Sequence, residues 1–96
     1  MIKPTVGRVV WYHPFETDPG PNPGDQPLCA LVTHVWSDTC INLAVFDVNG
    51  KTYGKTSVLL HQDELNRPDA GFAEWMPYQK GQAAKAEQLE AKIASA

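Results

Sequence analysis

The chain has 96 residues and a formal net charge of -3, with 43% hydrophobic and 20% charged residues. This length allows one domain with a modest core, and the composition is too hydrophobic for a disordered chain. Because the acidic balance gives no long-range basic field, we expect neither non-specific nucleic-acid binding nor attraction to an anionic membrane. The first residues lack an apolar stretch of signal-peptide length, and no run approaches a membrane span, so we expect a cytoplasmic protein.

The first 27 residues predict a strand and a long loop. Residues 6–13 are rich in β-branched and aromatic side chains and end before Pro14, which cannot donate to a strand ladder. Residues 14–27 contain five prolines and two glycines, with three acidic side chains among them. This composition predicts a proline-rich loop.

Two antiparallel strands joined by a polar turn are expected next, at residues 28–36 and 40–48. In the second of these strands the odd positions Ile41, Leu43 and Val45 are uniformly apolar, whereas the even positions are mixed. Because side chains alternate between the two faces of a strand, we assign these three residues to the core face.

A second hairpin follows directly. The pair Asn49-Gly50 predicts a type I′ turn, since both residues accept a positive φ. A fourth strand then lies within residues 51–61, with Gly54 as a candidate bulge.

The remaining β structure is short. Residues 62–70 are polar and predict a loop, and residues 71–78 return to aromatic content and predict a fifth strand that Pro77 ends. Five short strands predict a mainly β domain over residues 1–81, a small SH3-like partly open barrel, with an OB-like barrel as the alternative.

Residues 82–96 change character and consist mostly of strong helix formers, so they predict a C-terminal helical tail. Its apolar stripe is thin, with Leu89 and Ile93 four residues apart and Ala86 behind them. Since an isolated helix of this length is marginal in water, it needs a docking surface on its own barrel or on a second copy.

The two cysteines do not predict a disulfide. Depending on which two residues form the turn between the second and third strands, Cys29 faces Phe46 or Val48 and never Cys40. The Cα atoms of the two cysteines would then lie well beyond bridging distance.

Catalytic and metal-binding patterns are not evident in the sequence. The histidines and cysteines lack the spacing of a metal site, so we expect no metal and no cofactor. Ser57 and His61 share a strand face, but they are four positions apart. Along an extended strand this separation is about 13 Å, which is too far for a catalytic dyad. We therefore expect a binding protein rather than an enzyme.

Aromatic residues interleaved with basic and polar ones are the main indication of a binding surface. Rings stack on nucleobases, while Arg and Lys bind phosphates, although core packing explains most rings in so small a chain. Trp75, Tyr78 and Lys80 lie around Pro77 and favour a rim at a ligand site or a subunit interface. The candidate ligand-binding residues are Arg8, Trp11, His34, Trp36, Trp75, Tyr78 and Lys80.

Five segments resemble a family of small, mostly uncharacterised β-barrel proteins encoded by tailed bacteriophages and prophages. They are residues 3–8 (Lys-Pro-Thr-Val-Gly-Arg), 30–36 (Ala-Leu-Val-Thr-His-Val-Trp), 41–47 (Ile-Asn-Leu-Ala-Val-Phe-Asp), 56–58 (Thr-Ser-Val) and 74–77 (Glu-Trp-Met-Pro). The resemblance includes a proline-containing loop after the first strand and a Trp-x-Pro near the C-terminus. The alanine-rich tail departs from the shorter members.

This resemblance implies a phage anti-defence protein of the host cytoplasm. Such a protein sequesters a nucleotide-derived immune signal, a cyclic nucleotide or an ADP-ribose derivative, without cleaving it, and needs only a preorganised pocket. Because one barrel of this size is too small to enclose a dinucleotide, we expect pockets between the subunits of a homo-oligomer.

Two alternatives stay open. Tailed phages use many small barrels as joints, so the chain is also compatible with a virion structural or assembly protein. It is equally compatible with an inhibitor of a host protein, in which the acidic loops at residues 16–25 and 63–69 imitate the charge of nucleic acid.

Overall fold

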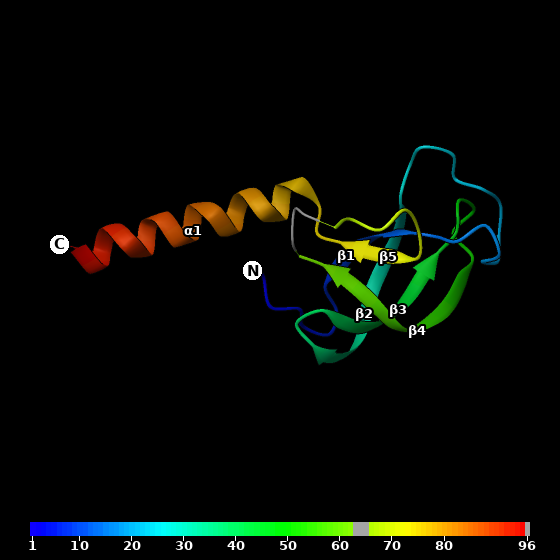
Figure 1. The fold of residues 1–96 in the computed structure, drawn as a ribbon, viewed down its shortest axis with the longest axis horizontal. Helices are drawn as coiled ribbons and strands as arrows, with labels where there is room; N and C mark the ends of the chain where they lie inside the picture. Colours follow the sequence, from blue (N-terminus) through cyan, green and yellow to red (C-terminus); the bar gives the residue numbers. More distant parts are fainter. Residues whose placement is uncertain (63–65, 96) are drawn as a thin grey trace.

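The computed structural model of the chain describes residues 1–62 and 66–95, with side chains in the C-terminal helix as far as residue 86. Five strands precede one helix (Figure 1). They are β1 (Val9–His13), β2 (Leu28–Ser37), β3 (Cys40–Phe46), β4 (Thr52–His61), β5 (Phe72–Glu74) and α1 (Pro77–Ser95). The predicted mainly β fold with a C-terminal helix is confirmed.

The strands form a closed barrel in consecutive order from β1 to β5. Neighbours are antiparallel except for β4 and β5, which pair in parallel, and β5 also pairs with β1. The consecutive order fits an SH3-like barrel more directly than the Greek-key order of an OB barrel. The barrel was expected to be partly open, and the short β5 closes it by bridging both of its neighbours.

Regular alternation along the strands builds the core. Val10 and Tyr12 of β1 point inward, as do Ile41, Leu43 and Val45 of β3, and all five side chains are at most 2% exposed. The predicted core face of the third strand is therefore confirmed.

The β2–β3 hairpin changes register along its length. Cys29 pairs with Phe46, whereas Ser37 pairs with Cys40 next to the turn, because two irregularities interrupt the ladder between these points. Of the two partners predicted for Cys29, Phe46 and Val48, the structure has Phe46, and both cysteines are free.

The turn of the β3–β4 hairpin lies at the predicted residues, but its type differs from the prediction. The amide of Gly50 donates to the Asp47 carbonyl at 2.9 Å, and the amide of Asp47 donates to the Lys51 carbonyl at 2.8 Å. Gly50 has φ 81°, whereas Asn49 does not have a positive φ. These features describe a three-residue loop that ends in a left-handed glycine, so the expected type I′ turn was wrong.

The bulge in β4 also differs from the prediction. The register of β3 and β4 shifts opposite Asn42, and Ser57 there has φ 52°. The amide of Ser57 donates to Asn42 Oδ1 at 2.8 Å, which satisfies the group that the shifted ladder leaves unpaired. The bulge therefore lies at Ser57 and not at Gly54.

Helix α1 begins at Pro77, earlier than the predicted start at residue 82, and shortens the fifth strand accordingly. Proline is favoured at the first helical position because its missing N–H would have no helical partner there. Gln79 accepts a hydrogen bond from the Met76 amide at 2.8 Å, which is half of a capping box. The side chain of Gln79 also donates to the Val9 carbonyl at 2.8 Å and so ties the helix to β1.

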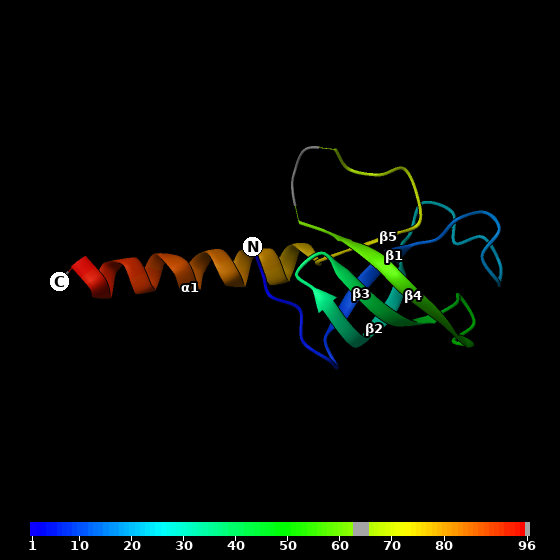
Figure 2. The ribbon, with the colours of Figure 1, turned by 60° about the horizontal axis from the view of Figure 1, so that its bottom comes forward.

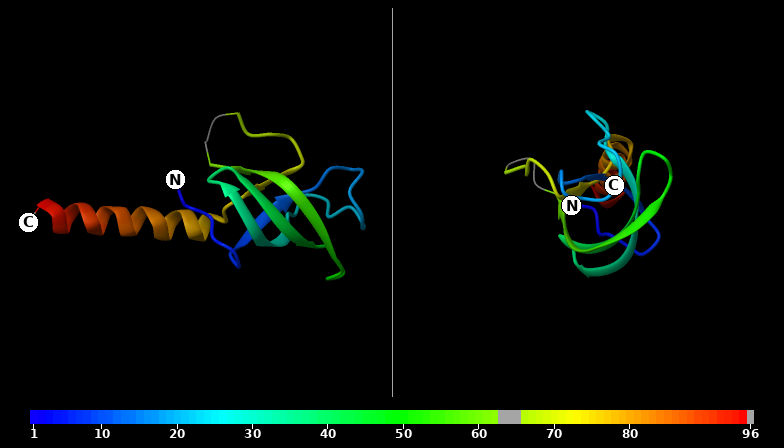
Figure 3. Two further views of the ribbon diagram at one scale, coloured as in Figure 1. Left: turned by 90° about the horizontal axis from the view of Figure 1, so that it is seen from below. Right: turned by 90° about the vertical axis from the view of Figure 1, so that its right-hand side faces the viewer.

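Beyond this attachment, α1 runs away from the barrel (Figures 2 and 3). The molecule measures 52 × 25 × 24 Å, and the loop of residues 14–27 lies at the end of the barrel opposite to the helix. Among the described residues, no helix combines the length and apolarity needed to cross a membrane. The predicted stripe of Leu89 and Ile93 lies outside the described side chains.

Candidate functional site

A cavity of about 430 Å³ lies where α1 leaves the barrel, and we call it the junction cavity. The N-terminal residues, the end of β4, β5 with the residue after it, and the first turns of α1 all contribute to its wall. The lining residues are Met1, Ile2, His61, Gln62, Arg67, Glu74, Trp75, Lys80, Ala83 and Ala84. Two of these residues, Arg67 and Lys80, bring cationic side chains to the wall of the cavity.

Glu74 is the centre of a polar cluster at this cavity. Its Oε2 accepts hydrogen bonds from Arg67 at 2.7 Å (Nη2) and 3.3 Å (Nε) and lies 2.9 Å from His13 Nε2. Glu74 is only 9% exposed, so the two partners compensate the cost of burying its charge.

An aromatic ring supports this cluster from the outer side of the barrel. Phe72 is 1% exposed yet does not belong to the barrel core, since its position in β5 points it outward. His13 stacks on Phe72 with ring centroids 4.7 Å apart, and the Arg67 guanidinium lies 5.0 Å from the same ring. The loop before β5 thus covers an apolar surface and positions the arginine.

The protonation states in this cluster follow from burial and neighbouring charge. Burial opposes ionisation of Glu74, but the hydrogen bonds and charge of Arg67 hold the pKa of Glu74 below its ordinary value. Burial also lowers the pKa of His13, against the attraction of Glu74. Near neutral pH the cluster is therefore an Arg67–Glu74 ion pair beside a neutral histidine.

Trp75 and Lys80 supply further recognition groups. Trp75 is 1% exposed, and its indole Nε1 is buried without an acceptor among the described residues. Lys80 is exposed on the first turn of α1 and close enough to lower the pKa of Glu74. Because this N–H is buried, a ligand in the cavity does not reach it, and Lys80 is the donor that this part of the wall offers.

Gln62 fixes the N-terminal wall of the junction cavity. Its side-chain amide donates to the Ile2 carbonyl at 2.6 Å and to the Asp38 carbonyl at 3.1 Å, and its oxygen accepts from the Ile2 amide at 3.2 Å. This two-way pairing holds residues 1 and 2 against the barrel, where Ile2 packs on the core.

The structure brings together only two of the seven residues predicted to bind a ligand. Trp75 and Lys80 line the junction cavity, whereas Tyr78 is 74% exposed and not part of its wall. The predicted aromatic rim is corrected here, because Trp75 is a core residue rather than a rim residue.

The other four predicted residues lie elsewhere. His34 and Trp36 contact each other on β2 with ring centroids 4.4 Å apart, and Trp36 donates to Asn42 Oδ1 at 3.0 Å. Arg8 is exposed before β1, and Trp11 is half-buried on the outer side of β1. None of these four lines the junction cavity.

Sequence reasoning missed His61, Arg67 and Glu74 as site residues. Glu74 offered a signal, since it is a lone charge inside an apolar segment, and such a charge needs a partner when buried. Arg67 gave none, because a basic residue in a polar loop looks the same whether or not it folds back onto the barrel.

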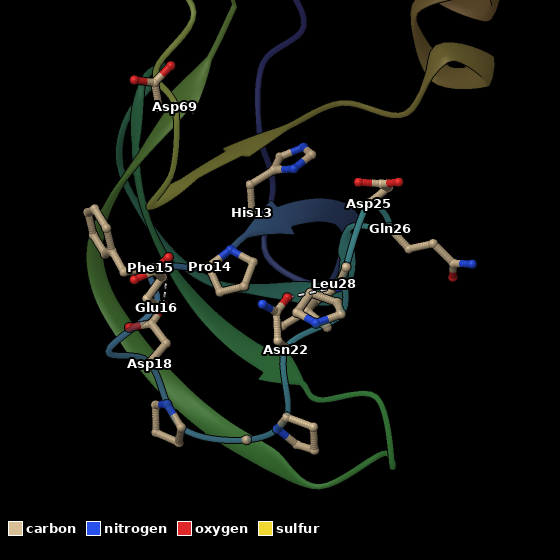
Figure 4. Close-up of a pocket in the computed structure, with 15 residues that line it drawn as sticks. His13, Pro14, Phe15, Glu16, Asp18, Asn22, Asp25, Gln26, Leu28 and Asp69 are labelled. Atoms are coloured by element: carbon tan, nitrogen blue, oxygen red, sulfur yellow. Dashed lines mark hydrogen bonds between the residues drawn. The ribbon is translucent and has the colours of Figure 1, made fainter.

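A second cavity of about 350 Å³ lies among the proline-rich residues at the other end of the barrel (Figure 4). Asp18 anchors this loop: it accepts from Tyr12 Oη at 2.7 Å and the Phe15 amide at 3.1 Å, and it pairs with Lys55 at 2.9 Å. Burial opposes ionisation of Asp18, but these hydrogen bonds hold its pKa below the ordinary value. Burial and the hydrogen bond to Asp18 raise the pKa of Tyr12.

The remaining acidic residues are spread around this second cavity rather than gathered at one point. Figure 4 shows Asp25 and Asp69 on opposite sides of it, with Glu16 near Asp18. Within residues 1–62 and 66–95, no group of three or more His, Cys, Asp or Glu side chains is placed to hold a metal ion.

Comparisons with protein-family models, with curated proteins and with solved structures found no match to this chain. The structure therefore defines the class as a closed five-stranded β-barrel with a projecting C-terminal helix. The phage-family resemblance stays a prediction.

Proposed function

We propose that the chain is a binding protein that sequesters a nucleotide-derived anion in the junction cavity without cleaving it. The observation that carries this proposal is the convergence of two cations, Arg67 and Lys80, at one cavity whose wall also includes Trp75. The ligand class is the one that the phage-family resemblance implies, a cyclic nucleotide or an ADP-ribose derivative in the host cytoplasm.

The chemistry of the wall supports an anionic ligand with an apolar part. Glu74 is neutralised by Arg67, so Lys80 adds a net positive charge beside a hydrogen-bonded ion pair. Cationic donors form charge-assisted hydrogen bonds with phosphate oxygens. Ile2 and Ala83 offer apolar surface for a base or sugar on other parts of the wall.

The size of the cavity also fits this class. At about 430 Å³ it lies within the 300–1,000 Å³ typical of small-molecule pockets. It can hold one nucleotide unit, and a larger ligand would extend past the open side of the cavity. A second subunit, as expected from the sequence, would cover that extension.

Calorimetric titration with cyclic dinucleotides and ADP-ribose tests the proposal, with the unphosphorylated nucleosides as controls for the anion. Lys80→Ala should weaken binding about tenfold, since a hydrogen bond to a charged group contributes about 1.5 kcal/mol. Lys85→Ala is the matched control, because Lys85 is exposed on the same helix and does not line the cavity. If the chain binds none of these compounds, the proposal is contradicted.

Recovery of the ligand separates sequestration from catalysis. After incubation the protein is denatured by heat and the released compound is analysed by chromatography. We expect the intact nucleotide, and a shortened or hydrolysed product would show that the chain is an enzyme.

One observation favours a second candidate, an inhibitor of a host protein. Glu16, Asp25 and Asp69 come from the two loops expected to imitate nucleic-acid charge. All three line the second cavity, at the proline-rich end of the barrel (Figure 4). A rigid, proline-rich acidic surface suits a basic partner. If a triple Asn and Gln variant of these residues loses a partner captured from host lysate, and the junction cavity binds no nucleotide, this candidate replaces the first.

A further inference from the structure

The outer side of strands β1, β2 and β3 carries an apolar surface. Strands with one solvated face normally alternate apolar and polar side chains. Here several outward positions are apolar as well as the inward ones, although His13, His34 and Asn42 also face outward. We call this surface the outer apolar face, and it consists of Val9, Trp11, Cys29, Leu31, Ala44 and Phe46. All six side chains are half-buried or exposed.

The strand register makes these residues contiguous. Cys29 lies between Trp11 and Phe46, and in the neighbouring row Leu31 lies between Val9 and Ala44. Gly54 follows Ala44 in the second row, and a Cβ at Gly54 would have no neighbour within 4 Å. The first row thus has Trp11 and Phe46 on either side of Cys29, and the second row begins with Val9 and Leu31 and ends with the small residues Ala44 and Gly54. A contiguous apolar patch of this kind indicates an interaction surface.

The described part of helix α1, residues 77–86, is a second element that packs little on the barrel. All of its described side chains except Gln79 and Ala83 are exposed. A helix of 19 residues is marginal in water unless tertiary contacts stabilise it.

The attachment of α1 prevents it from covering its own outer apolar face. Pro77 starts the helix, and Gln79 bonds both the Met76 amide and the Val9 carbonyl, so the helix direction is fixed at its first turn. From there α1 runs away from the barrel, as Figures 1 and 2 and the left view of Figure 3 show. A straight helix cannot fold back without breaking these bonds.

We propose that the outer apolar face binds helix α1 of a second copy of this chain, in a two-fold symmetric dimer that exchanges helices. At 1.5 Å per residue, α1 is about 28 Å long, and the shorter dimensions of the molecule are 25 and 24 Å. The helix thus spans the barrel of a partner. A two-fold axis makes each copy donate one helix and one face, so both unpartnered elements are covered at once.

Analytical ultracentrifugation of the full chain and of three variants tests this arrangement. Ala44→Arg places a long charged side chain on the outer apolar face, and Ala86→Pro breaks α1 beyond its attached turns. Thr39→Arg is the matched control, because Thr39 is exposed in the β2–β3 turn, away from the face. Circular dichroism confirms that each variant keeps its fold, and Leu31→Lys replaces Ala44→Arg if that variant does not fold.

We expect the wild type and Thr39→Arg to sediment with the mass of two chains, and Ala44→Arg and Ala86→Pro with the mass of one. A monomeric wild type at micromolar concentration overturns the proposal. If Ala44→Arg dissociates the dimer but Ala86→Pro does not, the proposal is also overturned, because the outer apolar faces of the two copies would then pair directly with each other. A dimer that persists in both variants places the interface elsewhere.

Discussion

Replacement of Gly71 by alanine combines two separable effects at the residue that leads into β5. Gly71 has φ 71°, and its amide donates to the His13 carbonyl at 2.6 Å. A left-handed conformation is unfavourable for an L-residue by about 1–2 kcal/mol. In addition, a Cβ at this position would overlap the ring of Phe15, which packs directly on the glycine.

The second effect can be estimated from the exposure of the displaced ring. Phe15 is 48% exposed, so its expulsion loses about half of the 1.5–3 kcal/mol that full burial of a phenylalanine provides, or about 1 kcal/mol. We therefore expect Gly71→Ala to lower the free energy of unfolding by about 2–3 kcal/mol in urea titrations.

Gly24→Ala provides the matched control. Gly24 has φ 70°, nearly the same as Gly71, but a Cβ there would have no neighbour within 4 Å. It should show the backbone effect alone, about 1–2 kcal/mol. In a Phe15→Ala background the extra loss at Gly71 should disappear. If Gly71→Ala is no more destabilising than Gly24→Ala, the reasoning about the Phe15 contact is refuted.

Three further predictions concern the polar clusters. Asp18→Asn should destabilise the chain by about 1–3 kcal/mol, because it weakens the hydrogen bonds to Tyr12 and Lys55. Asp25→Asn is the control, since Asp25 is exposed, and equal unfolding midpoints of the two variants in urea would contradict the prediction. Burial lowers the pKa of His13 in the folded state, so stability is complete above the unfolded value near 6.5 and falls as the pH drops through the folded pKa. His13→Phe keeps an aromatic ring against Phe72 and should remove that part of the loss below about pH 6.5; an unchanged pH profile of unfolding would count against it. Arg67→Ala leaves Glu74 buried without its main partner, so it should destabilise the chain at pH 7 and reduce the loss of stability on acidification through the folded pKa of Glu74. Thermal melts at several pH values measure both effects. An equal shift of the melting temperature at all pH values would argue against the ion pair.

The local pattern of the sequence determined much of the fold. Ile41, Leu43 and Val45 alternate along one strand, and this period of two assigns the core face wherever the strand pairs. The length of the turn limited the partner of Cys29 to Phe46 or Val48, because a short turn fixes the register of a hairpin, and the two irregularities of the ladder decided for Phe46. The turn at Gly50 and the bulge at Ser57 were misjudged in detail, since several backbone solutions satisfy the same short sequences.

The candidate site was predicted only in part. Trp75 and Lys80 were expected to lie near each other because they are only five positions apart in the chain, and both line the junction cavity. Their roles differ from the expectation, since whether a tryptophan is a rim or a core residue depends on which way its strand faces. Trp75 follows β5, whose short length and double pairing only the closed barrel reveals.

What only the tertiary structure decided are the contacts between residues far apart in the chain. Arg67 reaches Glu74 and His13 because the loop before β5 folds over the outward ring of Phe72. The direction of α1 depends on one hydrogen bond from Gln79 to Val9, seventy residues away in sequence. Alternation and turn chemistry are local properties and can be read from neighbouring residues, whereas the partner of a buried charge or the direction of a helix depends on how distant segments close around the barrel.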